Sequence, residues 1–425
     1  MRIACRILPV ALSVGLLGFG TVGQSVARLL VERTDGLLTL SHIFNRNVAR
    51  KRVDWVPDTV VWTDRVDDVF EAGVDIVVEV VGGLDPARAW HERALDMGRP
   101  VVTANKQLIA THGQALLTQA ASRGVDLLFE AAVGGGIPVV RGLREGIAAE
   151  RLTTVSGILN GTCNYILTRM ESAGLAFDAA LAEAQQLGFA EADPTDDLEG
   201  YDARAKLCIL ARVGLALDLS PADVPCESIR TISDDDFVYA RRLQATIRQV
   251  SRVAAADDHV EARVGPALVP LTSPLARVIG SQNLIVAGGD YGRETTFSGY
   301  GAGGFPTAVA VVSDLLAIAR RAGAAPAAWP ATRKPAAVTN LQVAPYYLRL
   351  VVRDRPGIIA SLASIFSTHG INIDAVLQEP GGTKDRLPFV ITLEACPTSA
   401  MTQAVAEIAT LPFHVTPPLC LPVLG

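Results

Sequence analysis

The sequence predicts an α/β protein built from three successive units, and three observations support this. Between residues 11 and 130, short apolar runs alternate with amphipathic stretches. After Pro138 the helical stretches lengthen and strands become fewer, and from Tyr346 onward a compact strand–helix–strand–strand–helix order appears. The 425 residues are enough for two to four domains of about 100–200 residues each.

The first unit reads as a doubly wound α/β domain, since near-continuous apolar strands separated by helices are typical of a parallel sheet covered on both faces. The expected strands are Ala11–Leu17, Leu37–Phe44, Asp75–Val81, Pro100–Thr103 and Val125–Phe129. The expected helices between them are Val22–Val31, Pro86–Met97 and Lys106–Ser122. We expect this domain to cover residues 1–135 and to be completed by residues 305–325.

The second unit, over residues 136–304, reads as an α+β domain. Its expected helices are Val139–Ala149, Thr162–Ser172, Asp178–Leu187, Tyr201–Leu217 and Asp234–Val253, and its expected strands are Val260–Leu268 and Leu284–Ala287. A long apolar helix, Thr307–Arg320, then leads into a stretch rich in Ala and Pro. That composition indicates a linker, which we place at residues 326–345.

The third unit, residues 346–425, reads as a small ferredoxin-like module. Its expected elements are a strand at Tyr347–Val352, a helix at Gly357–Thr368, strands at Ile371–Gln378 and Pro388–Ala395, a helix at Met401–Thr410, and a last strand near Leu419–Leu424.

Composition points to a small-molecule partner. The net charge is −6 and no basic run exceeds Arg50–Arg52, which argues against nucleic acid or an anionic membrane surface. Six widely spaced cysteines without a Cys-x-x-Cys pattern indicate neither a zinc site nor a disulfide framework, so we expect a reducing cytoplasm. Arg2, Arg6 and the apolar run that follows resemble a short signal peptide, but no small-residue cleavage pattern follows them.

A glycine motif follows the first expected strand. Gly18-Phe19-Gly20-Thr21-Val22-Gly23 matches G-x-G-x-x-G and opens the first expected helix. The first glycine permits a tight turn, the second lets the backbone approach a pyrophosphate, and the third packs helix on strand. All six residues are therefore predicted to bind a dinucleotide, in a Rossmann-type domain; the alternative is a purely structural turn.

The end of the second expected strand favours NADP(H) over NAD(H), although NAD(H) use remains open. Asn45-Arg46-Asn47 stands where a carboxylate would hold the ribose 2′-hydroxyl. No carboxylate repels a 2′-phosphate there, and Arg46 is suited to pair with one. The competing interpretation is an ordinary solvated arginine.

Two further segments stand where α/β sheets bind ligands. Lys106 follows the strand that ends at Thr103, and the carboxyl ends of strands form the binding edge of such sheets. Position alone fits a cofactor or substrate contact and a surface lysine equally well. The glycine-rich turn around Gly303 precedes a helix and presents backbone N–H groups, which suits either cofactor binding or close packing.

An acidic segment leads into a helix that carries a lysine. Glu191–Asp202 holds six carboxylates in twelve residues, and Asp202 and Lys206 are spaced i, i+4. By spacing alone this is most simply an exposed ion pair beside a solvated loop. The functional alternative is that the carboxylates bind a substrate ammonium while Lys206 transfers a proton. The scattered histidines and the lack of a G-x-S-x-G elbow argue against zinc or serine hydrolysis.

Taken together, these blocks resemble homoserine dehydrogenase, the family that interconverts L-aspartate 4-semialdehyde and L-homoserine on the route to threonine and methionine. The resemblance spans nearly the whole chain. It rests on the blocks Gly18–Gly23, Val101–Lys106, Glu130–Pro138, Gly157–Leu167, Leu187–Asp202 and Gly301–Ala308.

The resemblance implies a role for each matching residue. Lys206 would be the proton donor, Lys106 would contact cofactor and assist proton transfer, and Glu191 and Asp202 would bind substrate. It also implies that the second unit binds substrate and forms dimers. A monovalent cation, usually sodium, would lie near four residues and be held largely by main-chain oxygens: Glu130, Val133, Gly135 and Ile137.

The last eighty or so residues resemble an ACT domain, a module that binds amino acids at dimer interfaces. The resemblance rests on Tyr346–Ala360 and Ile371–Gln378, with Pro356–Gly357 as the ligand-side turn and Asn372 and Gln378 as candidate contacts. It implies feedback by an amino acid, threonine first, and a homodimer or homotetramer. Two alternatives stay open: another NAD(P)-dependent oxidoreductase of amino-acid aldehydes, and a non-catalytic amino-acid sensor.

Overall fold

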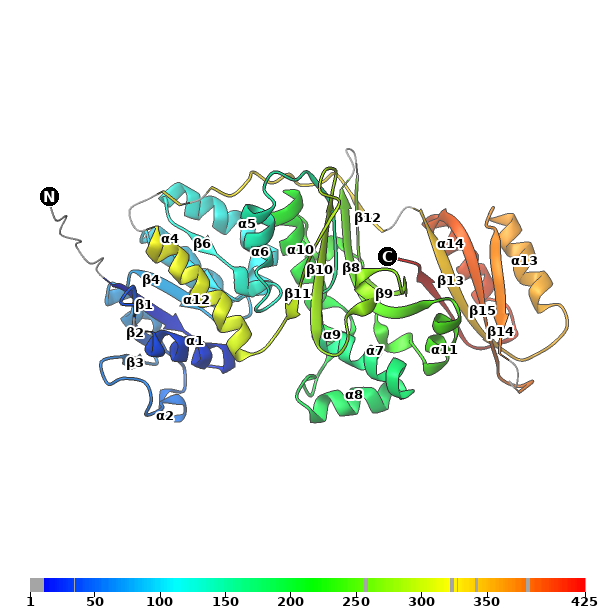
Figure 1. Ribbon diagram of the computed structural model, residues 1–425, viewed down its shortest axis with the longest axis horizontal. Coiled ribbons are helices and arrows are strands. Elements are labelled where there is room, and N and C mark those ends of the chain that lie inside the picture. Colours follow the sequence, from blue (N-terminus) through cyan, green and yellow to red (C-terminus); the bar gives the residue numbers. More distant parts are fainter. Residues whose placement is uncertain are drawn as a thin grey trace, which may run out of the picture. The chain divides into compact units, whose positions relative to one another are not determined.

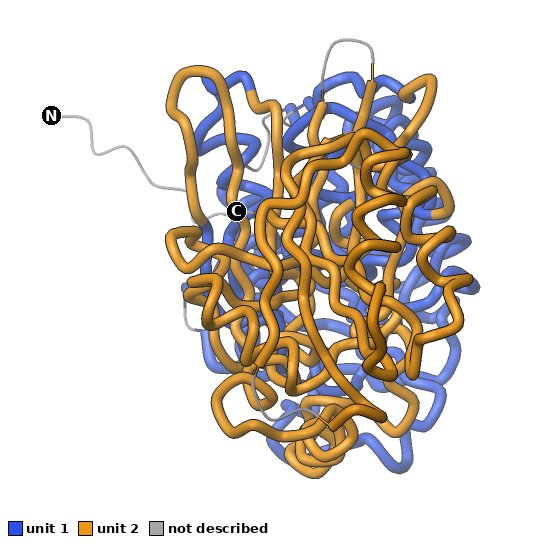
Figure 2. Tube along the Cα trace, turned by 90° about the vertical axis from the view of Figure 1, so that its right-hand side faces the viewer, with its two compact units in different colours: residues 1–151, 208–221, 297–334 blue, residues 152–207, 222–296, 335–425 orange. Residues whose placement is uncertain are grey.

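The computed structural model describes residues 11–33, 35–255, 259–321, 325–326, 328–340, 343–379 and 383–424. Cys5 and the charged part of the signal-peptide-like segment lie outside these residues, as do parts of the expected linker. The chain divides into two compact units (Figure 2): residues 1–151, 208–221 and 297–334 form unit 1, and residues 152–207, 222–296 and 335–425 form unit 2. Within the described ranges, no helix is long and apolar enough to cross a membrane.

Unit 1 contains a six-stranded sheet in the order β3-β2-β1-β4-β5-β6, with every neighbouring pair parallel. Its strands are β1 Leu12–Leu17, β2 Leu38–Phe44, β3 Val61–Thr63, β4 Ile76–Glu79, β5 Val101–Thr103 and β6 Leu127–Leu128. The order reverses between β1 and β4, and such a switch point is where open α/β sheets bind ligands at the carboxyl ends of the strands. The predicted Rossmann-type arrangement is confirmed.

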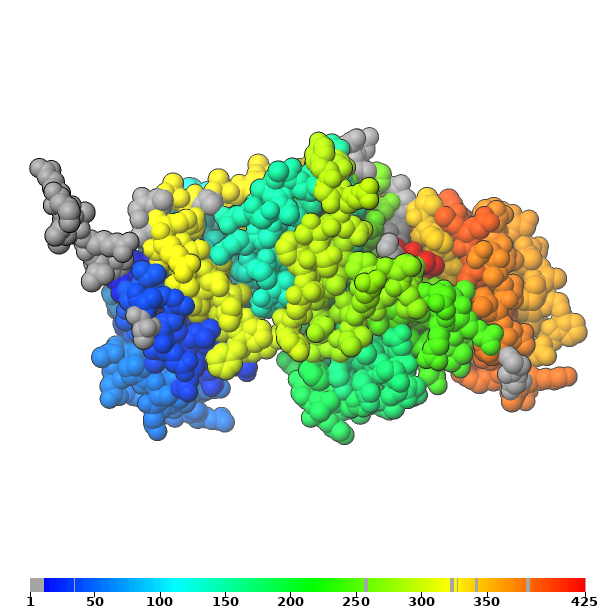
Figure 3. All heavy atoms as spheres, viewed as in Figure 1, coloured from blue at the N-terminus to red at the C-terminus, as the bar shows by residue number. Residues whose placement is uncertain are grey.

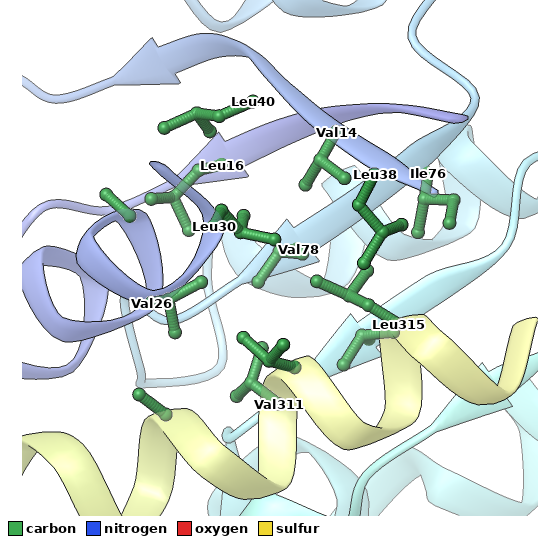
Figure 4. Close-up of a cluster of buried hydrophobic side chains, with 14 of the residues drawn as sticks. Val14, Leu16, Val26, Leu30, Leu38, Leu40, Ile76, Val78, Val311 and Leu315 are labelled. Carbon is green, nitrogen blue, oxygen red and sulfur yellow. The ribbon is translucent and has the colours of Figure 1, made fainter. Parts of the chain in front are cut away.

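Helices cover both faces of this sheet (Figure 1). The helical elements of unit 1 are α1 Thr21–Glu32, α2 Val48–Lys51, α3 Val66–Glu71, α4 Ala87–Asp96, α5 Lys106–Arg123, α6 Val139–Arg141 and α12 Gly304–Arg320. On one face, Val26 and Leu30 of α1 and Val311 and Leu315 of α12 pack against sheet residues such as Leu16, as Figure 4 shows. On the other face α3 approaches so closely that a Cβ on Gly15 would lie 2.5 Å from Val69 Cγ1.

Unit 2 is organised around a mixed sheet in the order β11-β10-β7-β8-β9-β12. Its strands are β7 Leu152–Ile158, β8 Ala245–Ala255, β9 Val260–Pro270, β10 Gln282–Gly289, β11 Glu294–Tyr300 and β12 Val338–Thr339. Its helices are α7 Gly161–Ala173, α8 Phe177–Gln186, α9 Thr195–Leu198, α10 Tyr201–Leu215 and α11 Asp234–Arg242. The chain passes between the two units within α10 and within β11.

The C-terminal module belongs to unit 2 and has the expected element order. It consists of β13 Val343–Val352, α13 Ile358–Thr368, β14 Ile373–Gln378, β15 Leu387–Pro397, α14 Thr398–Ala409 and β16 His414–Pro422, with the antiparallel sheet order β14-β15-β13-β16. Tyr347, Val390 and Leu421 join the same apolar cluster as residues of α7 and α11. In Figure 3 the orange-to-red atoms of the module accordingly lie against the green atoms of the same unit.

Three sequence expectations about elements are wrong. Asp234–Val253 is not one helix: α11 ends at Arg242, Gln244 has a left-handed φ of +53°, and β8 follows. The expected helix Val139–Ala149 is only a short α-helix followed by a π-helical turn, Gly142–Gly146. The expected linker contains a strand, because Val338 and Thr339 pair with β9. Strands β3, β7 and β11 were not expected.

Candidate active site

The glycine motif forms a tight turn between β1 and α1. Gly18 has a left-handed φ of +109°, and a Cβ on Gly23 would lie only 2.2 Å from the Gly18 carbonyl oxygen. A Cβ on Gly20 would meet nothing within 4 Å. The first and third glycines are therefore required by the turn itself, whereas Gly20 borders open space, where a pyrophosphate fits. The side chain of Phe19 is buried against Trp62, so only its backbone can serve a cofactor.

The second glycine-rich turn lies beside the first. Gly303 precedes α12 with a φ of +122°, and a Cβ on Gly304 would lie 2.6 Å from Ser25 Oγ of α1. The N-termini of α1 and α12 therefore come together, and the N-terminal N–H groups of a helix favour anions. The residues present in unit 1 fit a dinucleotide.

Arg46 lies at the carboxyl end of β2, as expected, and is exposed. The turn around it is fixed by neighbours: Asn45 N–H donates to the Thr63 carbonyl (3.0 Å), and Asn47 N–H donates to Asn45 Oδ1 (2.9 Å). This turn holds the backbone while leaving the arginine side chain exposed to solvent.

A buried carboxylate organises the next two strand ends. Glu79 accepts hydrogen bonds from the N–H groups of Val81 (2.7 Å) and Gly82 (2.9 Å) and from Thr103 Oγ1 (2.8 Å). Burial alone would raise the pKa of Glu79, but the hydrogen bonds, with His91 first among them, bring it below its usual value. Lys106, half-buried, begins α5 beside this edge.

The segment Glu130–Ile137 is a compact turn that meets Gly301. The Glu130 carboxylate accepts from the N–H groups of Val140 and Arg141, both at 2.8 Å, and burial raises its pKa. Gly135 has a φ of +54°, and a Cβ there would lie 2.6 Å from the Gly301 carbonyl carbon. Main-chain carbonyls and one carboxylate are hard oxygen ligands of the kind that alkali and alkaline-earth cations accept, so these residues fit the implied cation.

A cavity of about 460 Å³ opens beside this turn, bordered by Glu130, Arg141, Arg144 and Asp314. Asp314 Oδ2 accepts from the Glu130 N–H (2.9 Å), Asp314 Oδ1 accepts from Arg141 (3.0 Å), and burial raises the pKa of Asp314 to about 7. No cluster of three or more His, Cys, Asp or Glu side chains suited to a metal occurs among the described residues.

In unit 2, Lys206 is buried and held at two points. It is 9% exposed, and Nζ donates to Asp202 Oδ2 and to the Leu159 carbonyl, both at 2.7 Å. Asp202 Oδ2 also accepts from Asn160 Nδ2 (2.9 Å). The interpretation of Asp202 and Lys206 as an exposed surface pair is therefore wrong. An ammonium group has three donors, and two of those on Lys206 have these acceptors.

Asn160 links this pair to the acidic segment. It caps the N-terminus of α7, with Oδ1 accepting from Cys163 N–H (2.8 Å), and its Nδ2 also donates to Asp197 Oδ1 (2.6 Å). The pKa of Asp197 is raised mainly by burial, and the nearby negative charge of Asp202 raises it further. Not every carboxylate of the acidic segment joins these hydrogen bonds. Glu199 forms an ion pair with Arg230 at 3.2 Å instead.

Glu191 takes no part in the hydrogen bonds that join Lys206, Asp202 and Asn160. Its side chain is exposed, and its main-chain carbonyl accepts from Gln185 Nε2 (3.1 Å). The expected residues thus fall into two sets: the cofactor and cation residues with Lys106 belong to unit 1, and Glu191, Asp202 and Lys206 belong to unit 2.

Sequence reasoning missed three groups around Lys206. Asn160, the Leu159 carbonyl and Asn283, whose Nδ2 donates to that carbonyl at 2.9 Å, fix the position of the lysine. The Asn160-Gly161 pair before an apolar helical run is a capping signal that could have identified Asn160. Asn283 lies more than a hundred residues from Leu159 in the sequence and offers no such signal.

Comparison with known proteins gives consistent matches along the chain. Residues 18–130 match the NAD-binding domain model of homoserine dehydrogenase, residues 138–316 match the homoserine dehydrogenase model, and residues 346–412 match the ACT domain model. The homoserine dehydrogenase of Mycobacterium leprae is 40% identical over 418 residues, covering 94% of each chain. That of Bacillus subtilis is 37% identical over 392 residues, covering 90% of each.

Solved structures agree. The crystal structure of a homoserine dehydrogenase from Thiobacillus denitrificans matches with a TM-score of 0.90 and 33% identity, covering 98% of both chains. A hyperthermophilic archaeal homoserine dehydrogenase in complex with NADPH matches with a TM-score of 0.63 and 27% identity, covering 74% of this chain and 99% of that one. The chain therefore belongs to the homoserine dehydrogenase family of NAD(P)-dependent oxidoreductases and carries a C-terminal ACT domain.

Proposed function

We propose that this chain reduces L-aspartate 4-semialdehyde to L-homoserine in the cytoplasm, in the synthesis of threonine and methionine, with Lys206 as the proton donor. The observation that carries the proposal is the buried Lys206 ammonium, 2.7 Å from Asp202 and 2.7 Å from the Leu159 carbonyl. A nicotinamide cofactor, when bound, would supply the hydride for the aldehyde carbon. Lys206 then donates a proton from Nζ to the developing alkoxide, which yields the alcohol.

Asp202 positions the lysine, because its Oδ2 accepts a hydrogen bond from Lys206 Nζ, and Asn160 in turn fixes that carboxylate. We assign the substrate ammonium to the negative charge of Asp202 and the exposed Glu191, which lie within one acidic segment. Lys106, the first residue of α5, would contact the cofactor and assist proton transfer.

For the cofactor we propose NADP(H) as the preferred form. Its pyrophosphate would occupy the open space above Gly20, between the N-termini of α1 and α12, with Gly303 contributing backbone N–H groups. Arg46 would pair with the 2′-phosphate, because a guanidinium binds phosphate in a bidentate fashion and Asn45 and Asn47 do not repel it. The archaeal relative in complex with NADPH supports this choice.

We further propose a sodium ion held at Glu130, Val133, Gly135 and Ile137, mainly through main-chain oxygens. It would stabilise the turn that meets Gly301 and would take no part in the chemistry. The left-handed Gly134 and Gly135 support this assignment, because consecutive left-handed residues turn the carbonyl groups of a short loop.

For regulation we propose that the ACT domain binds an amino acid, with threonine as the expected effector. We also propose that the chain forms a homodimer or homotetramer. The edge strand β14 supports assembly, since an edge strand presents unpaired backbone groups to a second copy.

The test is a spectrophotometric assay of the purified full chain with L-homoserine and either NADP or NAD. We expect reduction of NADP at a kcat/KM at least tenfold above that with NAD, and slower turnover when L-threonine is added. Failure to oxidise homoserine with either cofactor would overturn the proposed activity. Equal use of both cofactors would overturn only the Arg46 assignment.

A further inference from the structure

A series of hydrogen bonds ties together two loops at the carboxyl edge of the unit 1 sheet. We call it the strand-end network, and it comprises the side chains of Glu79, Thr103 and Asn105 with the Gly83 carbonyl. Thr103 Oγ1 donates to Glu79 Oε2 (2.8 Å) and accepts from the Asn105 N–H (2.9 Å), and Asn105 Nδ2 donates to the Gly83 carbonyl (2.7 Å). The network therefore runs from the end of β4 to the end of β5 and back to the loop that follows β4.

The side chains of the strand-end network are buried. Glu79 and Thr103 are 0% exposed and Asn105 is 4% exposed. His91 of α4 also lies against the Glu79 carboxylate, with Nε2 3.2 Å from Oε2. Because a buried donor or acceptor is costly to leave unpaired, these bonds fix the two loops relative to each other.

Asn105 uses the two ends of its side-chain amide separately. Oδ1 accepts from the Leu108 N–H (3.1 Å) and caps α5, whereas Nδ2 holds the Gly83 carbonyl. Lys106 is the next residue and the first of α5. The backbone that carries Lys106 is thus fixed on its N-terminal side both to its own helix and to the neighbouring loop.

The loop that follows β4 borders the expected cofactor site. A Cβ on Gly18 of the glycine motif would lie 3.0 Å from Val81 Cγ2, so this loop packs against the nucleotide turn. A Cβ on Gly82 or Gly83 would meet no described atom within 4 Å. The loop is therefore packed on one side and open on the other, at the switch point between β1 and β4.

We propose that Thr103 and Asn105 are positioning residues that set the place of Lys106 relative to the cofactor-binding edge. The inference rests on the role given to Lys106 under the proposed function, and neither Thr103 nor Asn105 transfers a proton in it. Reactions that need aligned groups are sensitive to small displacements, since a shift of about 1 Å lowers a rate by about 10²-fold. Loss of the bond to Gly83 would free Lys106 to move by such an amount.

The first experiment measures kcat for homoserine oxidation by Asn105→Ser, Lys106→Ala and the double variant, each at high enzyme concentration. Serine is also a good N-cap, so Asn105→Ser keeps the cap of α5 and loses the donor to the Gly83 carbonyl. We expect Asn105→Ser to lower kcat about tenfold to a hundredfold in the otherwise unaltered chain. When Lys106 is already alanine, the same change should lower kcat by less than about twofold, because its effect passes through Lys106.

Two results of this cycle would overturn the proposal. A further tenfold loss in the Lys106→Ala background would show that Asn105 acts independently of Lys106, as a purely structural residue does. Wild-type kcat in Lys106→Ala would overturn both the positioning and the role of Lys106. Homoserine oxidation by the unaltered chain tests the proposed activity separately from either result.

The second experiment uses Thr103 and decides the question if Asn105→Ser fails to fold. Thr103→Val keeps the shape of the side chain but removes the hydroxyl that joins Glu79 to the Asn105 N–H, and kcat should fall about tenfold. Thr103→Ser keeps the hydroxyl, so its kcat should stay within about twofold of wild type. Equal kcat values for these two variants would overturn the proposal.

Gln119→Ala is the matched control for the loss of an amide from the same helix. Gln119 also lies on α5, and its Nε2 also donates to a main-chain carbonyl, that of Glu92 (3.0 Å), near the other end of the helix. Its kcat should stay within about twofold of wild type, with thermal unfolding of each variant measured alongside. A loss of kcat in Gln119→Ala equal to that in Asn105→Ser would show that kcat follows the stability of α5, and would overturn the positioning role.

Discussion

Lys206 Nζ lies 2.7 Å from Asp202 Oδ2 one turn earlier on the same helix, and both side chains are largely buried. A buried ion pair is expensive unless further hydrogen bonds support it, and here Asn160 and the Leu159 carbonyl supply them. Such a pair is more consistent with a functional role than with surface stabilisation.

Lys206→Ala should therefore lower kcat by about 10²–10⁴-fold, the usual contribution of a positioned acid, while the Kd for NADPH stays within about twofold. Steady-state kinetics and fluorescence titration with NADPH measure the two quantities. Arg204→Ala removes a different cation from the same helix and should change kcat by less than about threefold. A Lys206→Ala enzyme that kept most of its kcat would remove the proton-donor role.

Arg46→Ala should weaken the binding of NADPH much more than the binding of NADH. Charge-assisted hydrogen bonds contribute roughly 1.5–3 kcal/mol, so the KM for NADPH should rise at least tenfold while that for NADH hardly changes. Arg88→Ala, which removes an exposed arginine that pairs with Glu92 on α4, is the matched control. Equal losses for both cofactors would contradict the 2′-phosphate assignment.

Alanine substitutions at two glycines of the nucleotide turn should have different effects, one on stability and the other on cofactor binding. Gly23→Ala places a Cβ about 2.2 Å from the Gly18 carbonyl oxygen, so the turn must open and unit 1 should be destabilised. Gly20→Ala meets no neighbour within 4 Å, so the fold should persist while the methyl group occupies the space of the pyrophosphate. Thermal unfolding and NADPH titration separate the two effects. Similar unfolding temperatures for the two variants would count against this division.

The parts predictable from the sequence are those that local chemistry determines. The glycine turn, the strand ends around Glu79 and Thr103, and the spacing of Asp202 and Lys206 all lie within short stretches. The full set of hydrogen bonds around Lys206 was not predictable, because Asn283 fixes the Leu159 carbonyl from a distant strand. Strand β8 was misread as helix because polar residues that normally mark the solvent face, such as Arg248 and Gln249, are each 2% exposed there.

Removing the C-terminal module should destabilise unit 2. The module buries Tyr347, Val390, Leu419 and Leu421 in one cluster with α7 and α11, and Arg349 forms a 2.8 Å ion pair with the buried Asp236. Each such apolar side chain contributes roughly 1.5–3 kcal/mol. A chain ending at Pro345 should therefore show a lower unfolding temperature and exposed apolar surface, measured by calorimetry and dye binding. A soluble truncated enzyme with the same unfolding temperature as the intact chain would show that the module does not stabilise the rest of unit 2.

Glu79 should make the stability of unit 1 depend on pH on the acid side. The pKa of Glu79 is lower in the folded chain than its usual value of 4.5, so the unfolded state binds the proton more tightly. Its stabilising contribution is thus complete above about pH 4.5 and is lost as pH falls through the lower folded pKa. Glu79→Gln keeps an acceptor for Val81 and Gly82 but offers Thr103 no second oxygen.

That variant should lose about 2 kcal/mol of unfolding free energy at pH 7, and the difference from wild type should shrink as pH falls below 4.5. All four tryptophans of the chain, at positions 55, 62, 90 and 329, belong to unit 1, so urea unfolding followed by tryptophan fluorescence reports on this unit. Glu71→Gln, an exposed carboxylate at the end of α3, should leave the curve unchanged at every pH. A difference between Glu79→Gln and wild type that is constant from pH 3.5 to 7 would contradict the assignment.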